Sequence, residues 1–238
     1  MQTKQDNITI RKSEERGRAD HGWLKTYHSF SFANYYDPVH MGFRSLRVIN
    51  DDKIAPKGGF PMHPHSDMEI FSYIVSGAIS HADTMGNSRT LKPGEVQLMS
   101  TGSGIRHSEF NPSETEELHL LQIWLTPNKR GLTPSYTEWK PNTEQENAAK
   151  TLIISQDGKD ASAVINQDAA IYRVKLKPEE QATHALSEGR GMWVQVIKGS
   201  VTLNDILLET GDAASTETEN TYTLSANTET ELLLFDLG

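Results

Sequence analysis

The chain has 238 residues and contains no cysteine. Without thiols it has no disulfide framework, no thiolate metal site, no iron–sulfur cluster and no cysteine nucleophile. A chain of this length can bury roughly 70% of its unfolded surface, so it needs no covalent staples to be stable. Any metal site in this protein must therefore use imidazole and carboxylate ligands.

The chain has fewer basic residues than acidic ones. The chain has 23 Lys and Arg against 32 Asp and Glu, which gives a formal net charge of −9 at pH 7. Nucleic acids and anionic membranes both need a basic surface, so we expect neither as a direct partner. No apolar run is long enough to span a bilayer, and the polar segment Met1–Ile10 lacks the apolar stretch of a signal peptide. These absences predict a soluble, acidic protein of the cytoplasm.

Helix signals are weak, whereas short apolar segments rich in strand formers recur along the chain. Gly, Pro and Asn separate these segments, which is typical of an all-β sandwich or barrel. The segment 46–50 is expected to end at an acidic turn formed by Asp51 and Asp52. The expected strands are residues 46–50, 69–75, 96–99, 118–125, 152–154, 171–176, 192–197, 201–203 and 231–235.

The two halves of the chain share a rhythm of strands and glycines. Gly77 and Gly94 in the first half correspond to Gly199 and Gly211 in the second, at offsets of 122 and 117 residues. A duplicated β-barrel with loops of different length would show this pattern, and so would a chance similarity between β segments. We place the boundary at the polar connection near 143–150, with domains at 1–140 and 141–238.

Two clusters combine histidine with carboxylates at alternating positions. They are His63, His65, Asp67 and Glu69 in the first cluster, and His107 and Glu109 in the second. Side chains alternate between the two faces of a strand, so the members of each cluster share a face wherever the chain is extended. Two antiparallel strands would then point three imidazoles and a carboxylate at one interior point.

Such a donor set suits a transition metal. Imidazole and carboxylate without sulfur bind iron(II), manganese, nickel, copper or zinc, and this set leaves positions open for a substrate or oxygen. The alternative is that these are ordinary surface or packed histidines, but two clusters on strands beside glycine-rich turns favour a metal site. In the second half His184 stands alone and no histidine follows Gly211, so we expect one metal per chain.

The sequence around both clusters resembles the two cupin motifs. Gly59–Glu69 is similar to the first motif, and Gly94–Gly104 with His107 and Asn111 is similar to the second. Two details depart from the usual pattern. Gly77 lies one position further from Glu69, and the proline usually found near the second glycine is absent.

Three further segments resemble the pirin family: His28–Pro38, Leu46–Asp52 and Thr101–Glu109. Pirins are bicupins, so the resemblance implies an all-β fold of two face-to-face β-barrels of the jelly-roll type, with a metal in the N-terminal barrel. Two fused barrels supply within one chain the partner surface that single cupins find by dimerising. We therefore expect a monomer.

The resemblance also implies a ligand set. Common cupins use the carboxylate of the first motif, here Glu69, whereas pirins use the carboxylate two residues after the second-motif histidine, here Glu109. Carried over by position, the metal ligands are His63, His65, His107 and Glu109. Glu69 is then a carboxylate near the ligands or in the cavity, or simply a strand residue at the barrel mouth. Iron(II) is the metal expected from the family, although zinc, manganese, nickel and copper also fit.

The activity implied by the resemblance is that of a quercetin 2,3-dioxygenase. Such an enzyme opens a flavonol with O2 and releases carbon monoxide, and Glu109 or Glu69 would accept the proton of the flavonol hydroxyl. The alternative is a non-enzymatic metal-binding regulator that acts through protein partners, and the sequence does not choose between them. An isomerase that uses histidine without metal is disfavoured, because the histidines pair at metal-ligand spacing.

The remaining histidines have plainer interpretations. His21, His28 and His40 are expected to be structural. His81 follows a turn and is expected to be exposed. His119 lies on an apolar strand, where we expect a local hydrogen bond.

Overall fold

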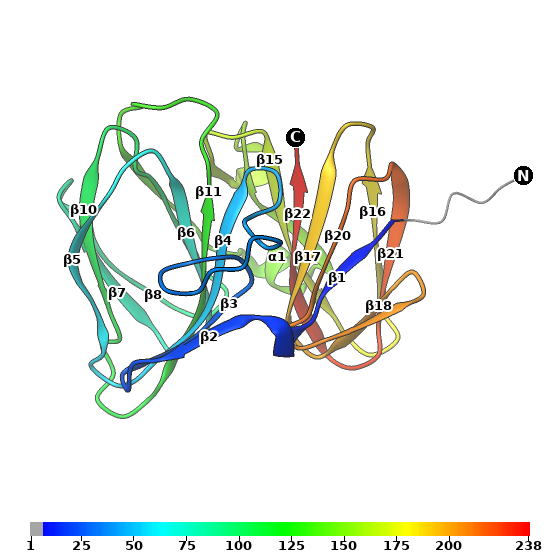
Figure 1. Ribbon diagram of the computed structural model, residues 1–238, viewed down its shortest axis with the longest axis horizontal. Helices are drawn as coiled ribbons and strands as arrows, with labels where there is room; N and C mark the ends of the chain where they lie inside the picture. Colours follow the sequence, from blue (N-terminus) through cyan, green and yellow to red (C-terminus); the bar gives the residue numbers. More distant parts are fainter. Residues whose placement is uncertain (1–6) are drawn as a thin grey trace, which may run out of the picture. The chain divides into compact units, whose positions relative to one another are not determined.

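Short antiparallel strands make up most of the computed structural model, which describes residues 7–238 (Figure 1). The contacts within the chain divide it into two units. The N-terminal unit comprises Arg16–Pro141 and Gln156–Gln167, and the C-terminal unit comprises residues 7–15, Asn142–Ser155 and Asp168–Gly238. The boundary predicted at residue 140 differs from this division in two segments. It places residues 7–15 in the N-terminal domain and residues 156–167 in the C-terminal domain.

Residues 1–6 of the polar segment Met1–Ile10 lie outside the described residues. No helix in the described part of the chain has the length and apolar character needed to cross a membrane. A cytoplasmic location stays a prediction.

The N-terminal unit contains two antiparallel sheets. The larger sheet has the order β12 (Ser135–Trp139), β9 (Val96–Ser100), β6 (Glu69–Ser76), β11 (Leu118–Leu125), β4 (Leu46–Ile54), β3 (Leu24–His28) and β2 (Gly17–Asp20). The smaller sheet has the order β5 (Gly59–His65), β10 (Ile105–Phe110), β7 (Ile79–Asp83) and β8 (Ser88–Leu91). The short strand β14 (Ala163–Val164) and the 3₁₀ turn Lys159–Ala161 lie in the segment 156–167.

One face of each sheet lines the interior of the N-terminal unit. Ile74 on β6 shares an apolar cluster with Ile79 on β7, and Ile70 on β6 shares another with Ile105 on β10. Burial of such a side chain contributes about 1.5–3 kcal/mol. Between these clusters the inward faces carry polar groups, and Ser72 on β6 donates a hydrogen bond across the interior to Glu109 on β10.

One sequence prediction about this unit is wrong. The strand that begins at Leu46 does not stop before an acidic turn, because β4 continues through Asp51 and Asp52 to Ile54 in pairing with β3 and β11. The first histidine cluster is not one extended segment, so the shared face expected of an extended chain does not apply to all four of its residues. The chain turns between β5 and β6, where Asp67 has a φ of 52°, in the left-handed region.

The C-terminal unit repeats this arrangement. One sheet has the order β1 (Thr9–Arg11), β20 (Ala213–Thr216), β17 (Gly191–Lys198), β22 (Thr230–Leu237), β15 (Ala169–Leu176) and β13 (Lys150–Ser155). The other has the order β16 (Gln181–Leu186), β21 (Asn220–Ala226), β18 (Ser200–Leu203) and β19 (Ile206–Glu209). Its interior is an apolar cluster that includes Val194, Tyr222 and Leu234.

Matching turn glycines accompany the matching strand order. Gly77 has a φ of 77° between β6 and β7, and Gly199 has a φ of 86° between β17 and β18. A Cβ at either position would collide with a backbone carbonyl oxygen, that of Glu117 or of Glu229. Both turns therefore need glycine, which is why the rhythm is readable in the sequence. The repeated order and the shared glycine turn agree with a duplicated unit.

The polar connection near 143–150 contains the helix of the described chain. The helix α1 (Thr143–Asn147) begins after Asn142, whose side chain accepts a hydrogen bond from the backbone N–H of Gln145. The Gln145 side chain accepts one from the backbone N–H of Asn142 in return. This capping box stabilises a helix that is otherwise too short to persist. A 3₁₀ turn at Ser13–Glu15 precedes β2.

Candidate metal centre

Three histidines converge inside the N-terminal unit. His63 and His65 lie on β5, and His107 lies directly opposite His63 on the neighbouring strand β10. The ring centroids are 4.4 Å apart for His63 and His107, 4.7 Å for His63 and His65, and 5.0 Å for His65 and His107. Each ring offers a nitrogen atom that lies within 4.8 Å of the other two. The alternation predicted for these strands thus brings the three imidazoles together.

The nitrogen atoms of these histidines are available to a metal. The His63 Nδ1–H donates to the carbonyl oxygen of Pro61 at 2.8 Å, which leaves the Nε2 lone pair free. His107 is fully buried, and neither of its ring nitrogens has a hydrogen-bond partner. Buried polar atoms are rarely left unpaired, so this arrangement fits a ligand that supplies the missing contact.

The surroundings of His65 and His107 keep these two imidazoles neutral. Burial, reinforced by the nearby His63, lowers the pKa of His65 to about 4. Burial and then the same neighbour lower the pKa of His107 to about 2. The neutral imidazole is the form that binds metals. The donor set therefore fits a divalent transition metal at neutral pH.

Glu109 lies on the same strand as His107, two residues further along it and on the same face. It is 1% exposed and accepts hydrogen bonds from three side chains, those of Ser72, Gln97 and Gln122. Burial raises its pKa to about 7 against the effect of the Ser72 hydrogen bond, and the nearby Asp52 raises it further. Its carboxylate lies within 4.8 Å of donor atoms of His107 and His81.

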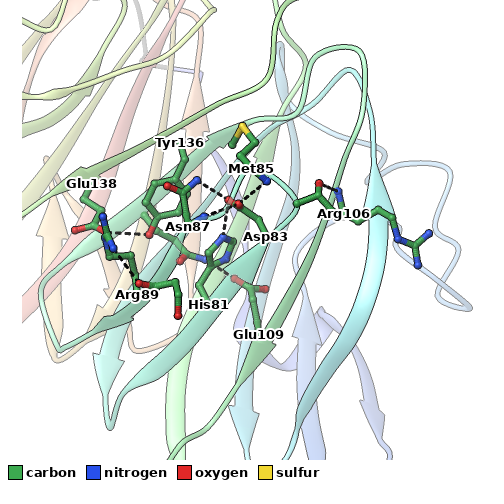
Figure 2. A network of polar contacts seen from close by, with 12 residues as sticks. His81, Asp83, Met85, Asn87, Arg89, Arg106, Glu109, Tyr136 and Glu138 are labelled. Carbon is green, nitrogen blue, oxygen red and sulfur yellow. Dashed lines mark hydrogen bonds and ion pairs between the residues drawn. The ribbon is translucent and has the colours of Figure 1, made fainter.

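His81 is a part of this cluster that sequence reasoning missed. Its predicted exposure is wrong, because it lies on β7 with 2% exposure and its ring centroid is 5.4 Å from that of His107. Its Nε2 contacts Asp83 Oδ2 at 3.1 Å, while its buried Nδ1 has no hydrogen-bond partner. Figure 2 shows Asp83 held in turn by the backbone N–H groups of Met85 and Asn87. The spacing of two residues between His81 and Asp83 on one strand was the available signal.

Glu69 does not join the histidines. It lies three residues before Ser72 on β6, and strand alternation places the two side chains on opposite faces of the sheet. Its carboxylate accepts hydrogen bonds from Ser100 Oγ at 2.7 Å and from the backbone N–H of Asn166 at 3.1 Å. Burial raises its pKa, while Ser100 and Asn166 act against the rise. The structure gives this carboxylate partners of its own, away from the interior.

A cavity of about 610 Å³ opens beside His63 and His65. Its aromatic walls are Trp23, Phe32, Tyr35, Phe60 and Trp124. Its polar lining includes Thr26, His28, Asn50, Asp52 and Gln122. A concave space with apolar walls and a few converging polar groups is typical of a small-molecule site. Its aromatic lining suits an aromatic ligand.

Comparison with known proteins identifies the family. Residues 9–125 match the family model described as Pirin. The chain is 43% identical to a pirin-like protein of Caulobacter vibrioides over 225 residues, covering 94% of this chain and 96% of that one. This chain belongs to the pirin family. Residues 152–237 match the model of a quercetinase C-terminal cupin domain, so the bicupin fold expected from the sequence is confirmed.

Two other pirin relatives are closely similar. A quercetin 2,3-dioxygenase of Escherichia coli K12 is 48% identical over 230 residues, covering 97% of this chain and 98% of the other. The bacterial pirin YhhW of Escherichia coli, solved in complex with nickel(II), has 47% identity and a TM-score of 0.92, with 97% and 98% of the two chains covered. A solved metal complex at this similarity agrees with the donor set found here.

Proposed function

We propose that this protein is a metal-dependent dioxygenase that opens the ring of a flavonol such as quercetin with O2 and releases carbon monoxide. The observation that carries the proposal is the convergence of the His63, His65 and His107 imidazoles beside an aromatic-lined cavity whose wall includes His63 and His65. The quercetin 2,3-dioxygenase relative at 48% identity supports the same reaction and substrate class.

In this proposal His63, His65, His107 and Glu109 hold one metal ion, with iron(II) the metal expected for the family. When bound, the metal supplies Lewis-acid and electron-transfer chemistry to the flavonol and O2. The protein holds the ligand strands in register, and the Pro61 carbonyl fixes the tautomer of His63. The aromatic walls orient a planar substrate and exclude water from it. Glu69, which faces away from the histidines, has no role in this chemistry.

Oxygen uptake tests the proposed reaction. Iron(II)-reconstituted protein is expected to consume about one O2 per quercetin degraded, while His107→Ala treated with iron in the same way consumes none above the rate of free iron. A Clark-type electrode with parallel absorbance measurement follows both reactants. Equal oxygen uptake by the two proteins would show that the histidine cluster does not carry the reaction.

The proposed site predicts the metal content of the protein. In the part of the chain that the structure describes, both groups able to hold a metal lie in the N-terminal unit and share His107. Two ions at one shared imidazole would repel each other, so we expect one tightly bound metal per chain. Elemental analysis of protein prepared without a metal-binding tag checks this number, and two tightly bound ions per chain would contradict it.

The oligomeric state is a further expectation. We propose that the protein is a monomer, because one chain already carries two cupin units, the number that single cupins reach by dimerising. Light scattering at micromolar concentration is expected to give the mass of one chain, 26.6 kDa. A stable mass of twice that value would overturn the proposal.

A further inference from the structure

Asp52 is an interior carboxylate of the N-terminal unit that the proposed ligand set does not use. It lies on β4 next to Asp51, and the two side chains take opposite faces of the sheet. Asp51 contacts Arg16 Nη1 at 3.1 Å and His119 Nε2 at 2.6 Å, so its charge is compensated. Asp52 faces the other way and lines the cavity beside the histidines.

The carboxylate of Asp52 lacks the partners that a buried anion requires. The residue is 2% exposed, and its Oδ1 has no hydrogen-bond partner. Burial raises the pKa of Asp52 to about 7, with Thr26 and His119 acting against the rise and Asp51 adding to it. A buried acceptor left unpaired costs on the order of 1–3 kcal/mol, so a donor that enters the cavity recovers this energy.

Two other polar groups of the cavity, Asn50 and Gln122, have partners within the protein. Asn50 Oδ1 lies 2.7 Å from His28 Nδ1, and the Gln122 side chain donates to Glu109 at 3.0 Å. Thr26 lies directly opposite Asp52 on β3, and its hydroxyl group acts as a donor that lowers the pKa of Asp52. Asp52 Oδ1 therefore remains available to a donor on a ligand in the cavity. An acceptor beside a hydroxyl matches a ligand hydroxyl group, which both donates and accepts.

We propose that Asp52 recognises a phenolic hydroxyl group of the substrate and accepts its proton. The O–H bond of the ligand breaks, an O–H bond forms on the Asp52 carboxylate, and the ligand is left as a phenolate with no change of oxidation state. The inference rests on the proposed function, because the aromatic substrate supplies the hydroxyl. The sequence analysis considered Glu69 as a carboxylate in the cavity, and this inference assigns that role to Asp52 instead.

The test measures the protonation state and the affinity of bound quercetin. Iron(II)-reconstituted protein is mixed with quercetin under argon, where no turnover occurs, and the absorption band of the bound ligand is recorded. Loss of a phenolic proton moves this band to longer wavelength. We expect the wild-type protein to bind the anion, and Asp52→Asn to bind the neutral ligand on the order of 10–100-fold more weakly. Asp51→Asn, altered on the opposite face of the same strand, is the matched control and should bind the anion.

A set of quercetin methyl ethers, each blocking one hydroxyl, provides the second measurement. We expect the wild-type protein to bind one of these ethers more weakly than quercetin, on the order of 10-fold or more. Asp52→Asn should bind the same ether less than about threefold more weakly than quercetin. An anionic band and wild-type discrimination in Asp52→Asn would overturn this inference and leave the proposed dioxygenase intact. Failure of the wild-type protein to bind quercetin would overturn both. If Asp52→Asn did not fold, the absence of any discriminating ether in the wild-type protein would still contradict the inference.

Discussion

Glu109→Gln, prepared without added metal, is expected to lose most of its bound metal, whereas Glu69→Gln is expected to keep it. Glu109 lies beside His107 in the interior, and replacing its charge with an amide removes an anionic ligand. Glu69 faces the opposite side of its sheet and is held by Ser100 and Asn166. Mutation of a group that only hydrogen-bonds to a metal ligand typically lowers metal affinity by about 10–100-fold. Mutation of a ligand itself should lower it further. Metal content per chain, measured by elemental analysis, checks the difference.

His81→Gln serves as the third arm of this comparison, because His81 is also within reach of His107 and Glu109. The proposed ligand set predicts that His81→Gln retains metal. Retention by Glu109→Gln together with loss from His81→Gln would assign the fourth ligand to His81. Loss from Glu69→Gln with retention by Glu109→Gln would instead indicate the arrangement of common cupins.

Asp52→Asn is expected to be more stable than the wild-type protein at pH 8, by an amount that disappears toward pH 4. The folded-state pKa of about 7 lies above the value of 3.8 for a free Asp. Between these two values the folded chain holds a proton that the unfolded chain has lost, so wild-type stability falls as pH rises through this range. Asparagine does not ionise, and the gain at pH 8 should be on the order of 4 kcal/mol. Urea unfolding of the metal-free protein at pH 8, 6 and 4 measures it.

Asp51→Asn is the control, and its expected change in stability at pH 8 has the opposite sign. Burial acts to raise the pKa of Asp51, but the hydrogen bond from His119 and the charge of Arg16 outweigh it and lower the pKa. Its contribution to stability is therefore present at neutral pH and lost as pH falls through the folded-state pKa. Asp51→Asn should be less stable than the wild-type protein at pH 8. A loss of stability in Asp52→Asn at pH 8 would show that the Asp52 carboxylate is compensated in the folded protein.

The histidine cluster was predictable because it depends on local alternation. His63 and His65 are two residues apart on β5, and His107 pairs with His63 in the sheet. The position of Glu69 was not predictable by the same rule, because parity holds only while the chain stays extended. The turn at Asp67 breaks the strand, and after it the numbering no longer tells which face a side chain takes. The repeated glycine turns followed from a pattern that backbone geometry requires.

The turn preference of aspartate kept the sequence from predicting an interior carboxylate at Asp52. Two adjacent aspartates after an apolar run are typical of a turn, yet in β4 they continue the strand. Asp51 is stabilised there by Arg16 and His119, which lie far from it in sequence. Asp52 retains an unsatisfied oxygen in the cavity. Such departures from local preference are expected at functional positions, and they become visible only when the partners from distant strands are known.

Carbon monoxide measurement tests the central claim most directly. Metal-stripped protein is titrated with iron(II), and the carbon monoxide released from quercetin in air is measured by gas chromatography of the headspace. The account predicts about one carbon monoxide per quercetin consumed, with a rate that rises to a plateau at one metal per chain and stays near zero in Glu109→Gln. Quercetin consumption without carbon monoxide, or carbon monoxide release that is the same in Glu109→Gln, would contradict it.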